Sequence, residues 1–143
     1  QETKTPIIMQ LRGPSLGMLR ELMDKFPGLN LLLDHASSPT LEDGYPYEEL
    51  KPLMALSDYP GLVLKVTTVN FRKAAKGNST PQDFMKALRE GFGAERLLWG
   101  SNFPSSEGAL SEHVQMALDA SRDFSDAERD AFMGGNAKRI FKL

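Results

Sequence analysis

The sequence has 143 residues, and its 17 Lys and Arg residues nearly balance its 19 Asp and Glu residues, giving a net charge of −2. Scattered basic residues argue against nucleic-acid or anionic-membrane partners. No apolar run approaches the roughly 20 residues of a membrane-spanning helix, and residues 1–5 lack the features of a signal peptide. The absence of cysteine excludes thiolate metal sites, disulfides and a cysteine nucleophile, and it favours a reducing compartment such as the cytoplasm.

Apolar runs separated by Gly and Pro predict strands that alternate with helices. In chain order, we expect a strand at 6–12, a helix at 15–25 with Ser15 as its N-cap, a strand at 29–35, a polar loop, and a helix at 47–56. The next elements are a strand at 62–67, a basic loop at 71–79 long enough to cover a site, a helix capped by Thr80, and a buried strand from Leu97 that Pro104 ends.

Residues from Ser111 onward are predicted to form helices. A helix begins near Ser111, and His113 in its first turn is expected at the surface. Ser125-Asp126-Ala127-Glu128 forms a capping box in which serine and glutamate satisfy each other's free amides. That helix is expected to end at Gly134-Gly135, and Asn136 to cap a final short helix at 137–141.

A repeat organises these elements. Phe26-Pro27-Gly28 recurs as Tyr59-Pro60-Gly61 and, more loosely, as Phe92-Gly93, so the aromatic residues are 33 positions apart. Such a period is the length of one strand–helix unit, and eight units would give about 264 residues, close to the ~250 of a (β/α)₈ barrel. The four units here predict an α/β fold, namely one half of a barrel in a single partial domain, residues 1–143. The alternative is a flavodoxin-like sheet of five strands, but only four strands and no glycine-rich phosphate turn are found.

Each predicted strand has polar residues at its carboxyl end, where parallel α/β folds place their chemistry. These residues are Gln10 and Arg12, Asp34 and His35, Lys65 and Thr67, and Ser101 and Asn102. We expect them to converge on a pocket. If the strands are regular, Asp34 points away from His35, and Asn102 shares a face with Leu98 and Gly100.

Three stretches resemble a known family: residues 33–39, residues 96–104 and residues 134–141. They are similar to the C-terminal half of the amidohydrolase-related family, which comprises TIM-barrel hydrolases and lyases. The resemblance implies that the strands here are the fifth to eighth of the barrel. His35 then ends strand six and Asn102 ends strand eight, while strands one to four, with the His-x-His motif of some members, lie outside the chain.

Two departures from the family pattern bear on metal binding. Metal-dependent members carry histidine at the end of strand five, where this chain has Gln10, Leu11 and Arg12. They also carry aspartate at the end of strand eight, where this chain has Asn102, and an amide is a poor Zn²⁺ ligand and no base at neutral pH. The resemblance is therefore strongest to the lactonase-like branch. We expect no metal ligand and no cofactor from this chain, although zinc could bind if the other half supplied ligands.

In that branch, His35 would be the general acid or base, and Asn102 would position the lytic water or polarise a carbonyl. Arg12 would bind a substrate carboxylate, with Gln10, Lys65 and Ser101 as further substrate-binding residues. The expected function is hydrolysis of small cyclic esters or related carbonyl compounds. The fragment alone should be inactive and should need its N-terminal half, or a second copy, as a partner. The alternatives are a metal-dependent amidohydrolase or decarboxylase with most ligands in the other half, and a non-catalytic α/β binding domain.

Overall fold

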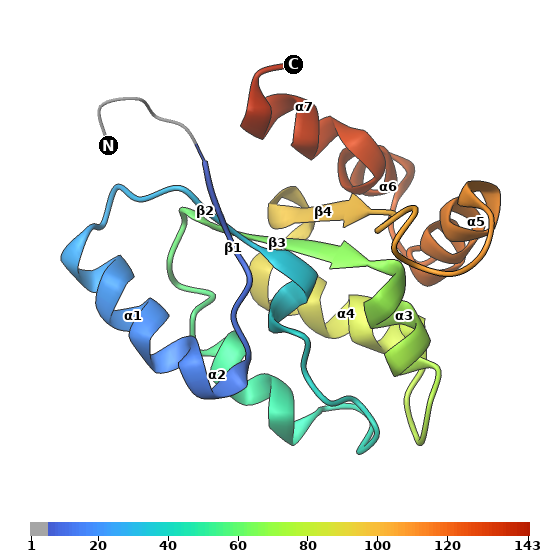
Figure 1. Cartoon of the computed structure of the whole chain (residues 1–143), viewed down its shortest axis with the longest axis horizontal. Helices are drawn as coiled ribbons and strands as arrows, with labels where there is room; N and C mark the ends of the chain where they lie inside the picture. The colour runs from blue at the N-terminus through green and yellow to red at the C-terminus, as the bar shows by residue number, and fades with distance from the viewer. Residues whose placement is uncertain (1–5) are drawn as a thin grey trace.

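The computed structural model describes residues 6–143, so the predicted absence of a signal peptide at 1–5 concerns residues outside the described part. Four strands form one parallel sheet, β1 (Ile7–Met9), β2 (Leu31–Leu33), β3 (Leu62–Thr67) and β4 (Leu97–Gly100), in the order β1-β2-β3-β4 (Figure 1). The register aligns Met9 with Leu33, Leu33 with Leu64 and Leu64 with Leu97. A flavodoxin-like sheet has the order 2-1-3-4-5. The sequential order excludes that alternative and agrees with half of a (β/α)₈ barrel.

Helices connect and follow the strands. Their bounds are α1 (Leu16–Lys25), α2 (Lys51–Met54), α3 (Thr68–Ala74), α4 (Pro81–Phe92), α5 (Leu110–Ala120), α6 (Asp126–Asp130) and α7 (Asn136–Phe141). Helices α1, α2 and α4 lie on one side of the sheet, and α6 and α7 lie beside β4 (Figure 1). Within residues 6–143, no helix combines the length and the apolar character that crossing a membrane requires.

The two faces of the sheet have different surroundings. Side chains that point toward the helices belong to the hydrophobic core and are at most 1 % exposed: Leu31, Leu33, Leu62, Leu64, Val66 and Leu97. The alternate positions, which include Ile8, Leu32, Val63 and Leu98, lie outside that core. In a complete barrel these alternate positions fill the interior. The outer face of the sheet is therefore buried against the helices. The alternate positions form a second, inner face, on which Ile8 at the sheet edge is 57 % exposed.

Helix α3 was not predicted. Residues 71–79 were expected to form a loop, but α3 follows β3 directly and continues to Ala74, which leaves a turn at 75–79. The helix begins with a capping box in which Asn70 Oδ1 accepts hydrogen bonds from Thr67 N (2.9 Å) and Thr67 Oγ1 (3.2 Å). A capping box normally pairs Ser or Thr with Glu or Gln. Asn70 takes the place of Glu or Gln here, and both Thr67 and Asn70 are completely buried.

The other helix boundaries differ from the predictions in smaller ways. The helix expected at 47–56 is a 3-10 turn, Glu48–Leu50, followed by the four residues of α2. A 3-10 turn at Gly13–Ser15 precedes α1, and the Ser15 side chain makes no capping hydrogen bond. Pro14 and Pro52 each occupy the start of a helical turn, where a missing N–H costs no hydrogen bond.

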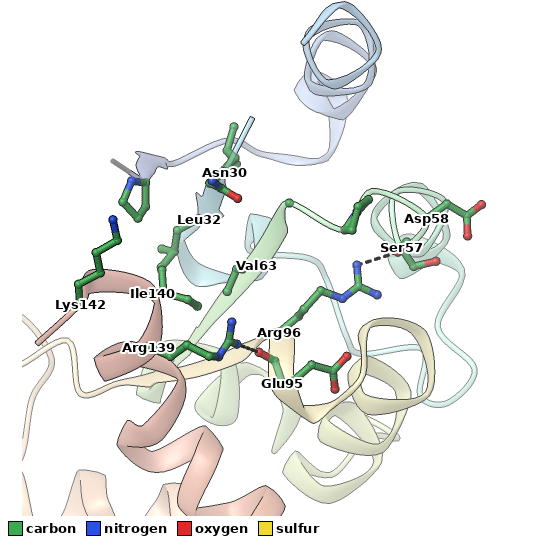
Figure 2. Close-up of a pocket in the computed structure, with 14 residues that line it drawn as sticks. Asn30, Leu32, Ser57, Asp58, Val63, Glu95, Arg96, Arg139, Ile140 and Lys142 are labelled. Carbon is green, nitrogen blue, oxygen red and sulfur yellow. Dashed lines mark hydrogen bonds between the residues drawn. The ribbon is translucent and has the colours of Figure 1, made fainter. Parts of the chain in front are cut away.

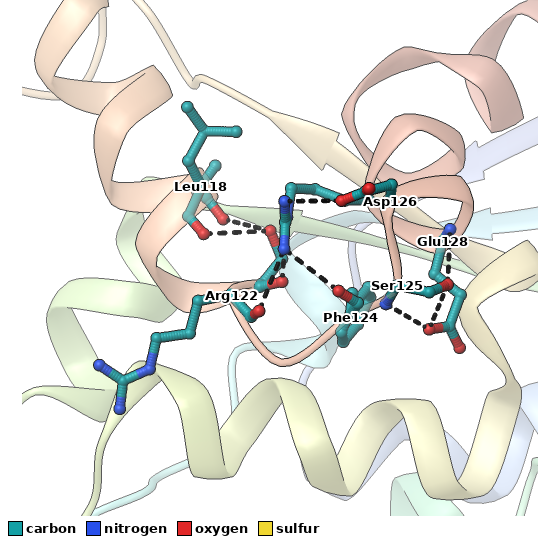
Figure 3. Close-up of polar contacts among 9 residues, drawn as sticks. Leu118, Arg122, Phe124, Ser125, Asp126 and Glu128 are labelled. Atoms are coloured by element: carbon teal, nitrogen blue, oxygen red, sulfur yellow. Dashed lines mark hydrogen bonds and ion pairs between the residues drawn. The ribbon is translucent and has the colours of Figure 1, made fainter.

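The capping box at Ser125 is confirmed (Figure 3). The Ser125 amide donates to Glu128 Oε2 (2.8 Å), and the Glu128 amide donates to Ser125 Oγ (3.3 Å). Arg129 extends back from α6 and donates to the carbonyl oxygens of Arg122 (3.0 Å) and Phe124 (3.1 Å) beyond the end of α5. These contacts attach the turn between α5 and α6 to α6, because they satisfy carbonyl groups of the turn.

The helix that begins at Ser125 does not end at Gly134-Gly135 as expected. A π-helical turn, Ala131–Gly135, joins α6 to α7, so the two glycines lie within continuous helix. Asn136 is not an N-cap: it has helical φ and ψ, is 3 % exposed, and donates from Nδ2 to Ala94 O (2.8 Å) and Leu97 O (2.9 Å). Its amide thereby attaches α7 to the start of β4, an interaction between segments about 40 residues apart that local sequence patterns do not reveal.

The prediction that His113 is a surface residue is also wrong. His113 is 0 % exposed, its Nε2 lies 2.9 Å from Glu107 O, and its ring packs edge-on against Phe103. The polar residues around it in sequence suggested solvent, but His113 is buried beside Glu107, whose carbonyl oxygen also accepts a hydrogen bond from Arg72 of α3. It is therefore a core histidine that positions the loop preceding α5.

Candidate active site

The polar ends of three strands meet at one cavity. Gln10 and Arg12 after β1, His35 after β2 and Asn102 after β4 all line a hollow of about 500 Å³ at the carboxyl ends of the strands. This convergence is what the parallel order of the strands requires. Lys65 and Ser101 are not among the residues that line this cavity.

His35 is presented by an unusual backbone turn. Four consecutive residues after β2, namely His35, Ala36, Ser37 and Ser38, have positive φ angles of 53°, 44°, 64° and 51°. We call residues 35–38 the left-handed turn. Left-handed conformation costs a non-glycine residue roughly 1–2 kcal/mol, so surrounding contacts must hold it. Asn70 Nδ2 donates to His35 O (2.8 Å), and Lys73 Nζ donates to Ser38 O (3.1 Å).

The side chain of His35 is only 13 % exposed and lies between two polar partners. Its Nδ1 lies 2.7 Å from Thr67 Oγ1, which fixes the plane of the ring. Its Nε2 lies 3.8 Å from Asp34 Oδ2, beyond hydrogen-bonding distance. Nε2 is therefore the ring nitrogen without a fixed partner among the described residues, which leaves it for a ligand.

Asp34 does not point away from His35, contrary to the expectation from regular strand alternation. β2 ends at Leu33, and the left-handed turn brings the Asp34 carboxylate back toward the imidazole. Asp34 Oδ1 forms an ion pair with Lys65 Nζ (2.9 Å) and accepts from the His35 amide (3.0 Å). Lys65 thus binds Asp34. The aliphatic part of the Lys65 side chain also lies close to Gly100: if residue 100 had a side chain, its Cβ would be 2.5 Å from Lys65 Cε.

Asn102 also leaves the strand geometry assumed from the sequence. β4 ends at Gly100, and Asn102 has a φ of 56°, so it does not continue the face of Leu98 and Gly100 as expected. Its Nδ2 donates to Ser106 Oγ (2.9 Å) and its carbonyl accepts from Ser106 N (2.8 Å). Ser101 Oγ accepts from Phe103 N (3.1 Å). Ser101 therefore stabilises the loop after β4, while Asn102 is the member of the pair that lines the cavity.

Among the residues of this site that sequence reasoning missed, three stand out. Ser37 and Lys73 line the cavity, and Asn70 holds the turn that carries His35. Ser37 is 2 % exposed and its Oγ has no hydrogen-bond partner within the described residues. The pattern Thr67-x-x-Asn70 could have indicated the start of α3, and α3 would have placed Asn70 and Lys73, one turn apart, beside the site.

The described residues do not build a metal centre by themselves. No group of three or more His, Asp or Glu side chains within residues 6–143 is close enough to hold an ion. Beside the cavity, His35 Nε2 lies 3.8 Å from Asp34 Oδ2, and Asp34 is already paired with Lys65. A metal at this site would need further ligands from beyond residues 6–143.

A larger cavity of about 660 Å³ lies at the opposite, amino ends of the strands (Figure 2). Polar groups along it form structural contacts: Arg96 donates to Ser57 O (2.8 Å), and Arg139 donates to Glu95 O (2.6 Å). Ile140 of α7 faces the inner-face residues Leu32 and Val63 across it. In barrels of this kind, the amino-end face contributes stability and the carboxyl-end face contributes chemistry. The smaller cavity is therefore the candidate active site.

Comparison with known proteins agrees with this fold. The curated L-fucono-1,5-lactonase of Burkholderia ambifaria is 23% identical over 128 residues, which are 83% of this chain and 43% of the lactonase. A putative 2-pyrone-4,6-dicarboxylic acid hydrolase from Pseudomonas putida superposes with a TM-score of 0.77 at 23% identity, over 99% of this chain and 53% of that one. A zinc-bound amidohydrolase from Burkholderia multivorans gives a TM-score of 0.74 at 23% identity, over 96% and 52%.

The chain thus spans about half the length of the relatives it matches. Their likeness confirms the barrel half that the four-strand sheet indicated. A family model described as amidohydrolase matches all of residues 1–143. The chain therefore belongs to the amidohydrolase family.

Proposed function

We propose that this chain forms the C-terminal half of a barrel that hydrolyses lactones or related small carbonyl compounds. The observation that carries the proposal is the meeting of Arg12, His35 and Asn102, from three separate strand ends, at one cavity of about 500 Å³. That volume suits a small ligand. The likeness to a sugar lactonase and to a pyrone dicarboxylate hydrolase supports this substrate class.

In this proposal, His35 Nε2 takes a proton from water as the water oxygen attacks the lactone carbonyl carbon. The imidazolium then returns the proton to the ring oxygen as the bond between the carbonyl carbon and that oxygen breaks. Asn102 uses the rest of its amide, beyond the bond to Ser106, to orient the water or the carbonyl. The exposed guanidinium of Arg12 pairs with a carboxylate on the substrate.

A metal-dependent hydrolase is the second candidate, and the bound zinc of the Burkholderia multivorans amidohydrolase is the observation that favours it. For this chain, such a site would take at most His35 and Asp34 from residues 6–143, and its remaining ligands would come from the other half of the barrel. The chain by itself should lack turnover, because half of the strand ends of a complete barrel would be absent.

One series of assays on the protein expressed from its complete reading frame distinguishes the metal-free lactonase from the metal-dependent hydrolase. We would measure hydrolysis of a neutral sugar lactone and of a lactone that carries a carboxylate, with and without a chelator. Hydrolysis that persists after chelation supports the metal-free lactonase, and hydrolysis that zinc restores supports the second candidate. Arg12→Met should raise KM for the carboxylate-bearing lactone and leave the neutral lactone unaffected. Failure to hydrolyse either lactone under all conditions would overturn the proposal.

A further inference from the structure

A chain of hydrogen bonds runs from His35 into the buried start of α3. His35 Nδ1 lies 2.7 Å from Thr67 Oγ1, and Thr67 Oγ1 lies 3.2 Å from Asn70 Oδ1. Thr67 and Asn70 are both 0 % exposed. An unpaired polar group at such a depth costs about 1–3 kcal/mol, so the protons in this chain must be arranged to satisfy every contact.

The amide of Asn70 can take only one orientation. Its Oδ1 accepts from the Thr67 amide at 2.9 Å, and its Nδ2 donates to the His35 carbonyl oxygen at 2.8 Å. Exchanging the oxygen and nitrogen would place two donors against each other at Thr67 and two acceptors against each other at His35. Asn70 Oδ1 is therefore an acceptor at the position that Thr67 Oγ1 faces.

The fixed acceptor decides where the Thr67 hydroxyl proton goes. If that proton pointed at His35 Nδ1, Thr67 Oγ1 and Asn70 Oδ1 would meet at 3.2 Å with no proton between them. If it points at Asn70, Thr67 Oγ1 presents a lone pair to His35 Nδ1, and all contacts are satisfied when Nδ1 carries a proton. We infer that Thr67 and Asn70 are positioning residues that hold neutral His35 in the Nδ1–H tautomer and leave the Nε2 lone pair free for proton transfer.

This inference rests on the proposed function for its catalytic consequence, but not for the tautomer. The Nε2 side of the ring agrees with it, because Asp34 Oδ2 at 3.8 Å is too far to require a proton there and Asp34 Oδ1 is engaged by Lys65. Other charged groups that line the cavity are Arg12, Glu49 and Lys73. Asn70 has a second effect, because its bond to His35 O also supports the left-handed turn.

The direct test is nitrogen NMR of ¹⁵N-histidine-labelled protein, expressed from its complete reading frame, at a pH where His35 is neutral. A His35→Gln variant assigns the signals. We expect Nδ1 in the protonated, pyrrole-like range and Nε2 in the unprotonated, pyridine-like range. Thr67→Val, which replaces the hydroxyl with a methyl group, should move the proton to Nε2, and Thr67→Ser should restore the native pattern. Thr68→Val is the matched control, because Thr68 is equally buried but donates to Ser101 O.

A wild-type spectrum with the proton on Nε2 would overturn the inference whatever the variants do, and so would an unchanged tautomer in Thr67→Val. If Thr67→Val does not fold, Thr67→Ala gives the same readout. In kinetics, Thr67→Val should lower kcat roughly 10-fold or more at unchanged KM, bounded by the ~10²–10⁴-fold of a lost acid–base group. A changed tautomer with unaltered kcat would remove the positioning role. Full activity of His35→Gln would instead refute the proposed function and leave the tautomer result standing.

Discussion

At the residue scale, the candidate site depends on two residues that adopt the same rare backbone conformation. His35 and Asn102 have φ angles of 53° and 56° at the ends of their strands. Asparagine tolerates this region better than most residues, but histidine within a run of four such residues needs external support. Asn70 and Lys73 give that support from α3, and Ser106 holds Asn102. Conformations of this kind persist only where the surroundings impose them, and they cluster at functional sites.

Asn102 provides a test of metal dependence. The wild-type complete protein should contain less than one equivalent of zinc by elemental analysis, because an amide is a poor Zn²⁺ ligand. Asn102→Asp adds a carboxylate to the cavity that His35 lines, so zinc binding measured by calorimetry should tighten. Asn78→Asp adds the same charge on an exposed turn and should have no effect. A full equivalent of tightly bound zinc in the wild type would contradict the metal-free reading.

The polar ends of neighbouring parallel strands lie at one edge of the sheet, and this was enough to predict that Gln10, Arg12, His35 and Asn102 line one cavity, but not that Lys65 and Ser101 lie outside it. The orientation of the side chains could not be predicted. Alternation along an extended strand placed Asp34 away from His35, and the left-handed turn reversed that relation. The ion pair of Lys65 with Asp34 depends on the same turn, and so Lys65 lies outside the cavity.

At the scale of single elements, the start of α6 gives a pH-dependent prediction. The Ser125 amide and hydroxyl donate to the Glu128 carboxylate and lower the pKa of Glu128 from its ordinary value of 4.5. A carboxylate with a lowered pKa stabilises the folded state above its unfolded pKa, and this stabilisation disappears as the pH falls through the lower, folded-state pKa. The capping box should therefore contribute at neutral pH and fade below pH 4.5.

Ser125→Ala should lower the free energy of unfolding by about 1 kcal/mol at pH 7, the usual cost of a lost N-cap. Because the hydroxyl donor is gone, the pKa of Glu128 moves back toward its ordinary value. The difference between variant and wild type should therefore shrink at pH 3. Urea unfolding at the two pH values measures both effects, with exposed Ser105→Ala as the control. An equal difference at both pH values would show that Glu128 ionisation plays no part in the cap.

Elements with strong local signals were predictable, and elements that depend on distant contacts were not. The capping box at Ser125 has both of its partners within four residues, and it was found from sequence. Helix α3 depends on the burial of Asn70 against the turn after β2, and α7 continues through two glycines because Asn136 bonds to carbonyl oxygens about 40 residues earlier. Thr67-x-x-Asn70 is a local signal for the start of α3, but no local pattern reveals these distant contacts.

At the scale of the whole molecule, the sheet is half of a closed structure. Among the described residues, β1 pairs only with β2, and its Ile7 and Ile8 are 46 % and 57 % exposed. An exposed apolar strand edge is a site of further pairing. The inner face is less open than its strand order suggested, since Leu32 is 1 % exposed and lies by Ile140 of α7 (Figure 2).

The 143 residues alone should therefore associate. Light scattering at micromolar concentration should give a mass well above 15.9 kDa, and adding the remaining half of the barrel should yield one discrete complex. Ile8→Lys on the exposed edge should reduce self-association, while Lys76→Arg on an exposed turn should not. A stable monomer of 15.9 kDa that unfolds cooperatively would contradict the need for a partner.

The architecture was the most predictable feature of the molecule, because the 33-residue repeat and the parallel strand ends already defined half of a barrel. The chemistry was less predictable, since a complete barrel draws its active site from eight strand ends and this chain contains four of them. His35 is the central residue of the proposed site. It lines the cavity, its Nδ1 contacts Thr67, and its Nε2 has no fixed partner among the described residues.

The most direct measurement is therefore lactone hydrolysis by the complete protein with His35→Gln, compared with the wild type. Gln retains polarity and approximate size but cannot transfer the proton, so kcat should fall by ~10²-fold or more. His113→Gln serves as the matched control, because it alters a buried imidazole that does not line the cavity, and it should lower stability without lowering kcat per folded molecule. Unchanged turnover in His35→Gln would contradict the assignment of this cavity as the active site.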